Sequence, residues 1–488
     1  MVDADFVKPA KPAPPQVVAL SPADQNMPDV YICFLTLFPL STSSDNQAVY
    51  SKLKAGLSLT LSEFPFIGGR LARDEAAAGE RFQIQIDEHH GIKMIHRELK
   101  LSYPELKRNN FPCSAFDPEQ TLPVPIRSTK PDPAVMAIQA NFIHGGLILS
   151  ICVHHRACDA LSIGVVLKAW ALHTVAAEMA NGDVLGAAIG GLIPISTSRA
   201  PLCDGLIGAR LQDFPEYRVL DNRKATPARP PPMLKSPLGP LKLCIVYISA
   251  SHLADLKSVA SGSNATDGCI STNDALRAFL WRHITRARSK VASALQQPGS
   301  SSSPSSSSSS SFTSQDRLNF AVAVEARRRM VPALPADYLG NAVFYCPVTS
   351  DLSTVASPAM PLSDVAKLIR DAVSGFDTAK IRGVLGLIDS LPRASDLMIR
   401  VYDDPMRGFV ITSWADMGLY GLYWGVELGK VESVRAPNAV PPVGTPVCRV
   451  FPRLPNGALE ISICLEEPAI EALREDEEFI AYAEWKGM

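Results

Sequence analysis

The sequence predicts an α/β protein built from two layered domains, and three observations carry this prediction. Strand-like apolar runs alternate with helix-like segments along the whole chain. Of the 488 residues, 47% are hydrophobic, which is enough for two or three domain-sized cores. A stretch rich in Pro and Gly separates two halves of the alternation. We therefore expect an N-terminal domain over residues 1–185, a crossover linker over 186–240 and a C-terminal domain over 241–488.

The first half begins with a segment rich in Pro, Ala and Lys, residues 1–15, which we expect to be extended or mobile. The apolar run VYICFLTLFPL from Val30 predicts a strand. From residue 45 to 64, apolar residues recur at every fourth position, which predicts an amphipathic helix that Pro65 ends. Strand-type segments such as FQIQI then lead to the central stretch of this half.

That stretch is LILSICVHHRACDA, residues 147–160. Its first seven residues predict a short buried strand, and His154 and His155 follow at the strand end. Because successive side chains of a strand point to opposite faces, one histidine would face a cleft while the other packs. The apolar segment from Ala160, which stops at a glycine, predicts a helix with Asp159 near its N-cap.

His155 is the candidate catalytic residue of this turn. An ordinary histidine titrates near neutral pH, so it can take a proton from an alcohol or amine that attacks a carbonyl, which contributes about 10²–10⁴-fold. Asp159 could orient the imidazole, or it could cap the helix and brace the turn; the spacing does not separate these roles. A buried histidine beside a helix cap fits the same pattern.

Two other chemistries at this stretch are weaker. A zinc site needs three or four converging ligands, and no second His/Cys pair occurs at ligand spacing, so we expect no metal. A Cys/His nucleophile would use Cys152 or Cys158, but cysteines among apolar neighbours are usually packing residues.

The second half repeats the alternation. LKLCIVYIS from Leu241 predicts a strand, and ASHLADLKSVA and STNDALRAFLWRHITRAR predict helices, the second with capping residues at its start. Strands are predicted at NFAVAVEA, NAVFYCPV, GFVITSW and LEISICLEEP, and helices at 364–379, 382–390 and 469–485. Residues 298–314 form a serine tract that is too polar to pack, so we expect a disordered insertion there.

Composition limits the partners and the compartment. Lys and Arg number 47 against 49 Asp and Glu, so no general charge favours nucleic acid or an anionic membrane. The ten cysteines are scattered singly, which suits reduced thiols. The N-terminal segment has no apolar signal-like region, and the most apolar later segment is interrupted by charged residues. We expect a cytoplasmic monomer that is neither secreted nor membrane-spanning.

Taken together, the segments resemble the plant and fungal acyl-CoA-dependent acyltransferases of the BAHD type, which include fungal trichothecene O-acetyltransferases. Each segment is weak alone, but their common order over more than four hundred residues is specific. The segments are LSPADQ at 20–25, LKAGLSLTLSEFPFIGGRL at 53–71, HHRACDA at 154–160, STNDALRAFLW at 271–281, ARRRMVPALPADYLGN at 326–341, ITSW at 411–414 and LEEPAIEALREDEEFIAY at 465–482.

The resemblance implies two domains of chloramphenicol-acetyltransferase-like fold with mixed sheets and an active-site tunnel at their interface. It implies that His155, the second histidine of the HHxxxD motif, is the general base and that Asp159 is mainly structural. It also implies that the Thr412 hydroxyl and the Trp414 indole N–H line the position of the tetrahedral oxyanion. By residue type alone, Trp414 could also be a core aromatic.

One segment departs from the family pattern. The family has an Asp-Phe-Gly-Trp-Gly motif, whose aspartate pairs with an arginine like Arg327, whereas this chain has Tyr-Trp-Gly-Val-Glu from Tyr423. Arg327 then needs another partner, for which Glu325, Glu427 and the Tyr423 hydroxyl are the candidates. The departure also removes the basis for assigning CoA contacts to this loop.

The resemblance implies an acyltransferase that moves an acyl group, acetyl foremost, from acyl-CoA to an alcohol of a small secondary metabolite. Acyl-CoA would be a co-substrate, with no permanently bound cofactor. The alternatives are transfer to an amine, a condensation-like enzyme with carrier-bound substrates, and a non-catalytic homologue. The intact HHxxxD motif argues against the last of these.

Overall fold

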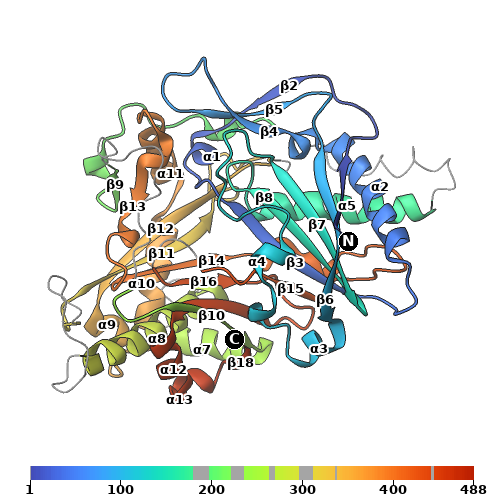
Figure 1. Ribbon diagram of the computed structural model, residues 1–488. Coiled ribbons are helices and arrows are strands. Elements are labelled where there is room, and N and C mark those ends of the chain that lie inside the picture. The colour runs from blue at the N-terminus through green and yellow to red at the C-terminus, as the bar shows by residue number, and fades with distance from the viewer. Residues whose placement is uncertain are drawn as a thin grey trace.

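The computed structural model describes residues 2–179, 197–220, 236–262, 270–295, 312–335, 338–440 and 445–487. Most of the serine tract predicted to be a disordered insertion, and much of the predicted crossover, lie outside the described residues. Two sheets organise the rest, one in each half of the chain (Figure 1). The mixed α/β architecture with two sheet-rich halves agrees with the sequence-based prediction.

The first sheet has six strands in the order β1-β6-β7-β8-β3-β15. The strands are β1 (Val2–Val7), β6 (Ile92–Ser102), β7 (Met136–His144), β8 (Gly146–His154), β3 (Tyr31–Pro39) and β15 (Ser433–Arg435). A three-stranded sheet beside it contains β2 (Gln16–Ala19), β5 (Phe82–Ile86) and β4 (Arg70–Arg73). β8 and β3 are antiparallel, so that Tyr31 lies opposite His154.

Two long helices, α2 (Asn46–Glu63) and α5 (Ala160–Met179), cover one face of the first sheet. They pack closely because Gly56 lacks a side chain: a Cβ there would lie 2.3 Å from Thr174 Oγ1. The Trp170 indole also donates a hydrogen bond of 3.0 Å to the Leu53 carbonyl. By length and composition α5 could cross a membrane, but 56% of its apolar window is buried inside the protein, as in a core helix.

The second sheet has seven strands in the order β12-β11-β14-β16-β17-β10-β18. The strands are β12 (Val343–Asp351), β11 (Arg317–Glu325), β14 (Gly408–Ser413), β16 (Val447–Val450), β17 (Leu459–Glu466), β10 (Leu241–Ile248) and β18 (Glu484–Gly487). Its outer face is covered by α7 (Ala250–Ser261), α8 (Thr272–Leu295), α10 (Leu362–Gly375) and α12 (Glu467–Arg474).

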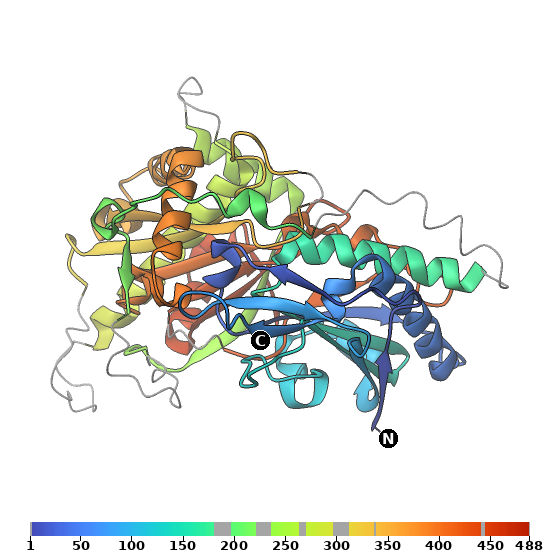
Figure 2. The ribbon, with the colours of Figure 1, turned by 90° about the horizontal axis from the view of Figure 1, so that it is seen from above.

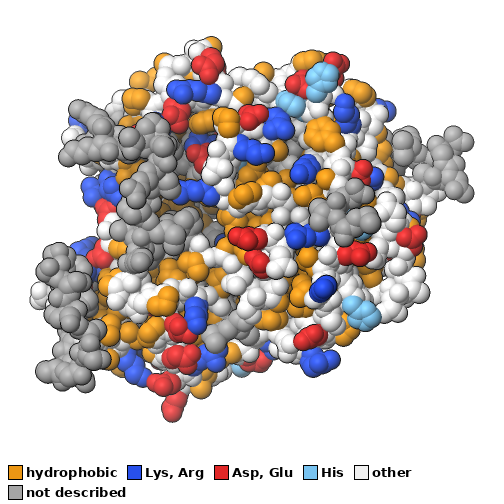
Figure 3. All heavy atoms as spheres, in the orientation of Figure 1, with side chains coloured by type: hydrophobic (Ala, Val, Ile, Leu, Met, Phe, Trp, Pro, Cys, Tyr) orange, Lys and Arg blue, Asp and Glu red, His pale blue; other side chains and the backbone are white. Residues whose placement is uncertain are grey.

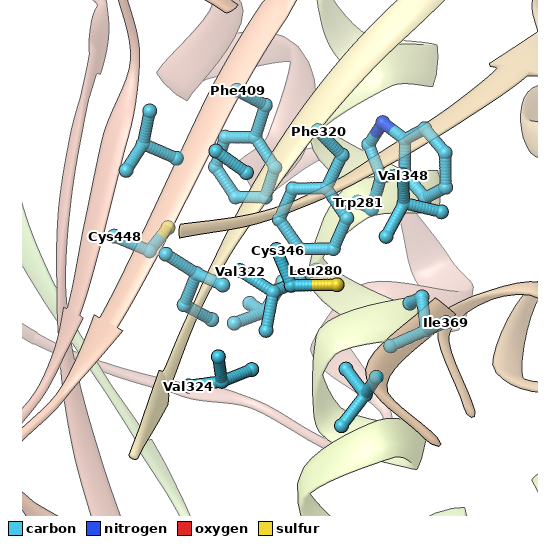
Figure 4. Close-up of a cluster of buried hydrophobic side chains, with 14 of the residues drawn as sticks. Leu280, Trp281, Phe320, Val322, Val324, Cys346, Val348, Ile369, Phe409 and Cys448 are labelled. Carbon is cyan, nitrogen blue, oxygen red and sulfur yellow. The ribbon is translucent and has the colours of Figure 1, made fainter. Parts of the chain in front are cut away.

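An aromatic stack fills the layer between this sheet and its helices (Figure 4). The Phe320 ring on β11 lies between Trp281 of α8 and Phe409 of β14, with ring centroids 4.9 and 5.1 Å away. All three side chains are at least 97% buried, and burial of such aromatic surface is a main source of stability for this half.

All but one of the remaining helices and strands are short. They are α1 (Pro22–Gln25), α3 (Tyr103–Arg108), α4 (Pro118–Thr121), β9 (Tyr217–Val219), α9 (Leu352–Ala356), α11 (Thr378–Asp389), β13 (Leu397–Ile399) and α13 (Glu477–Ile480). On the face seen in Figure 3, Lys and Arg are interspersed with Asp and Glu, so this face has no extended patch of one charge.

Three elements differ from the sequence-based expectations. Residues 2–7 are extended, one of the two states expected for residues 1–15, but they are also ordered as β1 and pair with β6. The helix predicted for 469–485 is interrupted, because Asp476 caps a new helix by accepting a hydrogen bond from the Phe479 N–H, 3.1 Å. The last part of that segment is β18, which pairs with β10.

The chain of the second half returns to the first sheet. β15 pairs with β3, and the segment that leads to it packs in the core of the first half (Figures 1 and 2). This return path brings the end of β14 against β3, the neighbour of β8 in the first sheet.

Candidate active site

The HHxxxD segment forms the turn between β8 and α5. The His154 N–H donates to the Val135 carbonyl at 2.8 Å, and the His155 N–H donates to the Val30 carbonyl at 2.9 Å. These two hydrogen bonds fix the chain on both sides of the strand end. Both histidines therefore lie where the sequence predicts: His154 is the last residue of β8 and His155 follows it.

His154 is a packing residue. Its side chain is fully buried, and its ring meets Tyr31 edge to face, with centroids 5.2 Å apart. Nδ1 accepts a hydrogen bond of 3.3 Å from the Arg156 N–H. Burial lowers the pKa of His154 to about 3, so this imidazole stays neutral at physiological pH.

His155 is only partly buried. Its Nδ1 atom is buried and has no hydrogen-bond partner, so the accessible edge of the ring is the one that carries Nε2. Burial lowers the pKa of His155, although its own backbone carbonyl, Asp159 and Asn341 oppose the shift. The imidazole is therefore neutral near pH 7, which is the state that a general base requires.

Asp159 caps α5 and joins the two halves. Its carboxylate accepts hydrogen bonds from the Ser162 N–H at 3.0 Å and from the Ala342 N–H at 2.9 Å. Arg327 donates two more, at 2.9 and 3.1 Å. Burial opposes ionisation, but the charge and hydrogen bonds of Arg327 and the two backbone N–H groups together outweigh it, so the pKa of Asp159 is lowered. The four bonds leave Asp159 in the capping and bracing role, one of the two that spacing alone left open.

Arg327 is held by several acceptors. Besides Asp159 it contacts Glu325 at 3.1 Å, and it donates to the Gly340 carbonyl at 3.0 Å. Of the three partners that the sequence suggested for Arg327, Glu325 is therefore confirmed. Asp159 was not among those candidates, because its link to Arg327 joins residues 168 positions apart.

The other two candidates lie elsewhere. Glu427 pairs with Lys52 at 3.1 Å, and Tyr423 is 46% exposed. The neighbouring Val426 N–H donates to Glu178 at 3.0 Å, near the C-terminus of α5. At 1.5 Å per residue, that helix end is about 28 Å from its start at Asp159. The expectation that this loop bears on Arg327 is therefore wrong.

A second link between the halves supports His155, and sequence reasoning assigned it no role. The Asn341 side-chain amide donates to the His155 carbonyl and to Asp24, both at 2.8 Å. Asp24 is fully buried and forms a capping box with Ser21. The Asn341 Oδ1 atom is buried without a partner, as is Nδ1 of His155. Asp24 and Asn341 lie in LSPADQ and ARRRMVPALPADYLGN, two of the segments that carry the family resemblance. That resemblance was the signal in the sequence that could have identified them.

Thr412 and Trp414 lie at the end of β14. Trp414 is 6% exposed and packs edge to face on Phe34 of β3, with centroids 6.0 Å apart. β3 is hydrogen-bonded to β8, the strand that ends just before His155, and Phe34 lies opposite Ile151 of β8 (Figure 1). Thr412 is partly buried. Trp414 thus packs in the core of the first half, although it directly follows a strand of the second.

Among the described residues, no group of three or more His, Cys, Asp or Glu side chains is placed to hold a metal ion. The chemistry that the neutral imidazole of His155 offers is general acid–base catalysis.

Several known proteins are similar to this chain along most of its length. A family model described as the Transferase family matches residues 1–480. Acyltransferase BOA11 of Botryotinia fuckeliana is 28% identical over 485 residues, 94% of this chain and 96% of that protein. Eremophilane O-acetyltransferase ORF8 of Penicillium roqueforti is 26% identical over 513 residues, which cover 96% of this chain and 98% of that protein. The crystal structure of F. sporotrichioides TRI101 with coenzyme A and T-2 has a similar fold, with a TM-score of 0.75 and 21% identity. The match covers 97% of this chain and 100% of that one.

Proposed function

Because the chain belongs to the Transferase family and is an acyltransferase, we propose that it transfers an acyl group, acetyl foremost, from acyl-CoA to a hydroxyl of a small secondary metabolite. The observation that carries the proposal is the state of His155: a neutral imidazole with one buried nitrogen and one accessible edge, at the junction of the two halves. The named O-acetyltransferases among its relatives support the choice of acyl group and acceptor.

In this mechanism Nε2 of His155 takes the proton of the acceptor hydroxyl as its oxygen attacks the thioester carbonyl carbon. The tetrahedral intermediate then collapses, the carbon–sulfur bond breaks, and the CoA sulfur leaves with the proton held by the imidazolium. A thioester is already activated, so no covalent acyl-enzyme is required. The products are the ester and free CoA, and His155 returns to its neutral state.

Negative charge gathers on the carbonyl oxygen in the intermediate. We assign its stabilisation to the Thr412 hydroxyl and the Trp414 indole N–H at the end of β14. In enzymes of known mechanism, loss of one such donor lowers kcat by about 10²–10³-fold. The approach of Trp414 to Phe34 supports this assignment, because it brings the β14 end to the first sheet.

Asp159 and Asn341 position the base without touching the reacting atoms. Asp159 holds the turn against Arg327, and Asn341 holds the His155 carbonyl against Asp24. Both links cross between the halves, which supports a site in a tunnel between them, open to acyl-CoA at one end and to the acceptor at the other. We also place the enzyme in the cytoplasm as a monomer; the nine described cysteines are free thiols, as in a reducing compartment.

The test is a screen of the purified protein with acetyl-CoA and longer acyl-CoAs against a panel of alcohols and amines. Thiol-reactive dye would report free CoA, and mass spectrometry would identify the product. We expect CoA release that depends on an alcohol and matches ester formation one to one. Intact-protein mass spectrometry with acetyl-CoA alone should show no acylated enzyme. Release without ester, or a stable acyl-enzyme, would contradict the proposal.

A further inference from the structure

Arg449 lies on β16, on the face of the second sheet that carries Thr412. In the strand register, Arg449 stands opposite Thr412 of β14 on one side and opposite Ser462 of β17 on the other. Directly opposed residues of neighbouring strands project from the same face, so Arg449 is the next side chain to Thr412 across the sheet, about 4.8 Å away by strand spacing.

The groups that surround this guanidinium come from both halves of the chain. Burial lowers the pKa of Arg449, and its electrostatic neighbours are Cys113, Cys464, Cys33 and Tyr345. Burial raises the pKa of Cys113 to about 11 and that of Cys464 to about 12, so these thiols are neutral at physiological pH. Arg449 therefore sits between the two sheets without a compensating charge from these neighbours.

Within the described ranges, Arg449 forms neither an ion pair nor a hydrogen bond. Its one recorded contact is with the Trp414 ring, whose centroid lies 4.7 Å from the guanidinium carbon. Glu460 is on the same face of β17, but both of its carboxylate oxygens bind Arg435, at 2.7 and 3.2 Å. The segment 441–444, which the structure does not describe, is Pro-Pro-Val-Gly and contains no acid.

Two buried arginines of the second half, Arg288 and Arg435, are paired on several sides. Arg288 binds Glu466 at 2.9 and 3.1 Å and donates to the carbonyls of Met406 and Pro405. Arg435 combines Glu460 with three backbone carbonyls. Arg449 differs from both, because it is only partly buried and its guanidinium has no acceptor among the described residues, so its donors remain accessible.

We propose that Arg449 is a specificity-determining residue that binds a carboxylate of the substrate, carried either by the acyl group or by the acceptor. The inference rests on the proposed function and deepens it. The Trp414 face holds the guanidinium by a cation–π contact and leaves its edge donors available, and these donors match a carboxylate bidentately. Because Thr412 is adjacent, the bound carboxylate would lie close to the reacting carbonyl, as in a dicarboxylic acyl-CoA or a hydroxy acid.

The test compares matched pairs of ligands on wild-type protein and Arg449→Met. For the acyl source, the dissociation constants of malonyl-CoA and acetyl-CoA are measured by calorimetry. For the acceptor source, hydroxycarboxylic acids of the acceptor panel are compared with their methyl esters in the presence of CoA. We expect wild type to favour the acidic member of one pair by about tenfold or more, and Arg449→Met to bring that ratio towards one.

Arg453→Met is the matched control, since Arg453 is an exposed arginine near the same strand. It should keep the wild-type ratio, and circular dichroism should show that both variants are folded. The pair that loses its preference identifies the source of the carboxylate. No acid preference in either pair, or one that survives in Arg449→Met, would overturn the inference while leaving acetyl transfer intact. If neither acyl-CoA binds, the proposed function fails and the inference fails with it.

Discussion

Replacement of Asp159 by alanine should destabilise the protein far more than removal of a surface carboxylate. The change deletes two hydrogen bonds to backbone N–H groups and two to Arg327. Loss of a helix N-cap costs about 0.5–2 kcal/mol, and breaking a buried ion pair from one side costs about 3–5 kcal/mol. The side chains of Asp159 and Arg327 are 7% and 15% exposed, so solvent screens little of the attraction between them. Because Glu325 still contacts Arg327, we expect about 3–5 kcal/mol in total.

The assay is urea denaturation followed by circular dichroism. Asp132→Ala is the matched control, because Asp132 pairs with Arg70 at 3.7 Å and its side chain is 59% exposed. That variant should change the free energy of unfolding by less than about 1 kcal/mol. Arg327→Met should repeat much of the Asp159→Ala loss, and the double variant should cost less than the sum. A loss below about 1 kcal/mol for Asp159→Ala would refute the bracing role.

The same ion pair predicts a pH dependence. Burial raises the pKa of Asp159, but the charge of Arg327 and the hydrogen bonds from Arg327, Ala342 and Ser162 together outweigh burial, so this pKa is lower in the folded protein than in the unfolded chain. Its contribution to stability is therefore complete above the unfolded value of about 3.9 and is lost as the pH falls through the folded value. The difference in unfolding free energy between wild type and Asp159→Asn should be constant from neutral pH down to about pH 4 and should shrink below it. A difference that shrinks near pH 6 instead would point to another group.

Three further substitutions test individual contacts. Asn341→Leu removes the link from Asp24 to the His155 carbonyl, so urea denaturation should show a loss of about 1–3 kcal/mol and kinetics a lower kcat; an unchanged kcat would mean that the link does not position the base. Thr412→Val keeps the shape but removes a donor, so kcat should fall by about 10²–10³-fold with little change in stability, and a loss confined to KM would contradict the oxyanion role. Tyr423→Phe should leave the free energy of unfolding within about 0.5 kcal/mol of wild type, because this side chain is exposed. A loss of about 1–2 kcal/mol would instead indicate that the Tyr423 hydroxyl binds Arg327, which the structure contradicts.

The elements with strong periodicity could be predicted from sequence. The strand before His154, the helix after Asp159, and the helices at 46–63 and 250–261 all lie within a few residues of their predicted positions. In each case the local pattern, an apolar run or a capped amphipathic segment, agrees with the tertiary structure. Strand geometry also predicted that His154 and His155 would lie in different surroundings. His154 packs against Tyr31, whereas His155 keeps an accessible edge.

The links that complete the site could not be found in this way. Arg327 and Asp159 are 168 residues apart, and Asn341 and Asp24 are 317 apart. No local periodicity encodes such side-chain pairs, because they depend on how the two halves dock. β15 was missed for a similar reason: three residues are too few to show alternation, and pairing with β3 defines the strand. The helix predicted for residues 469–485 is interrupted near Asp476, because Asp476 caps a new helix although the residues around it have a helical pattern.

The central claim is that His155 is the general base and His154 is not. Its most direct test is the single-turnover rate of ester formation for wild type, His155→Ala and His154→Ala, on variants first checked for folding and for CoA binding. The account predicts a fall of about 10²–10⁴-fold for His155→Ala with CoA still bound, and a smaller effect on the chemical step for His154→Ala. If His155→Ala kept more than a few per cent of the wild-type rate, or if His154→Ala were the more damaging of the two in the chemical step, the assignment of the base would be wrong.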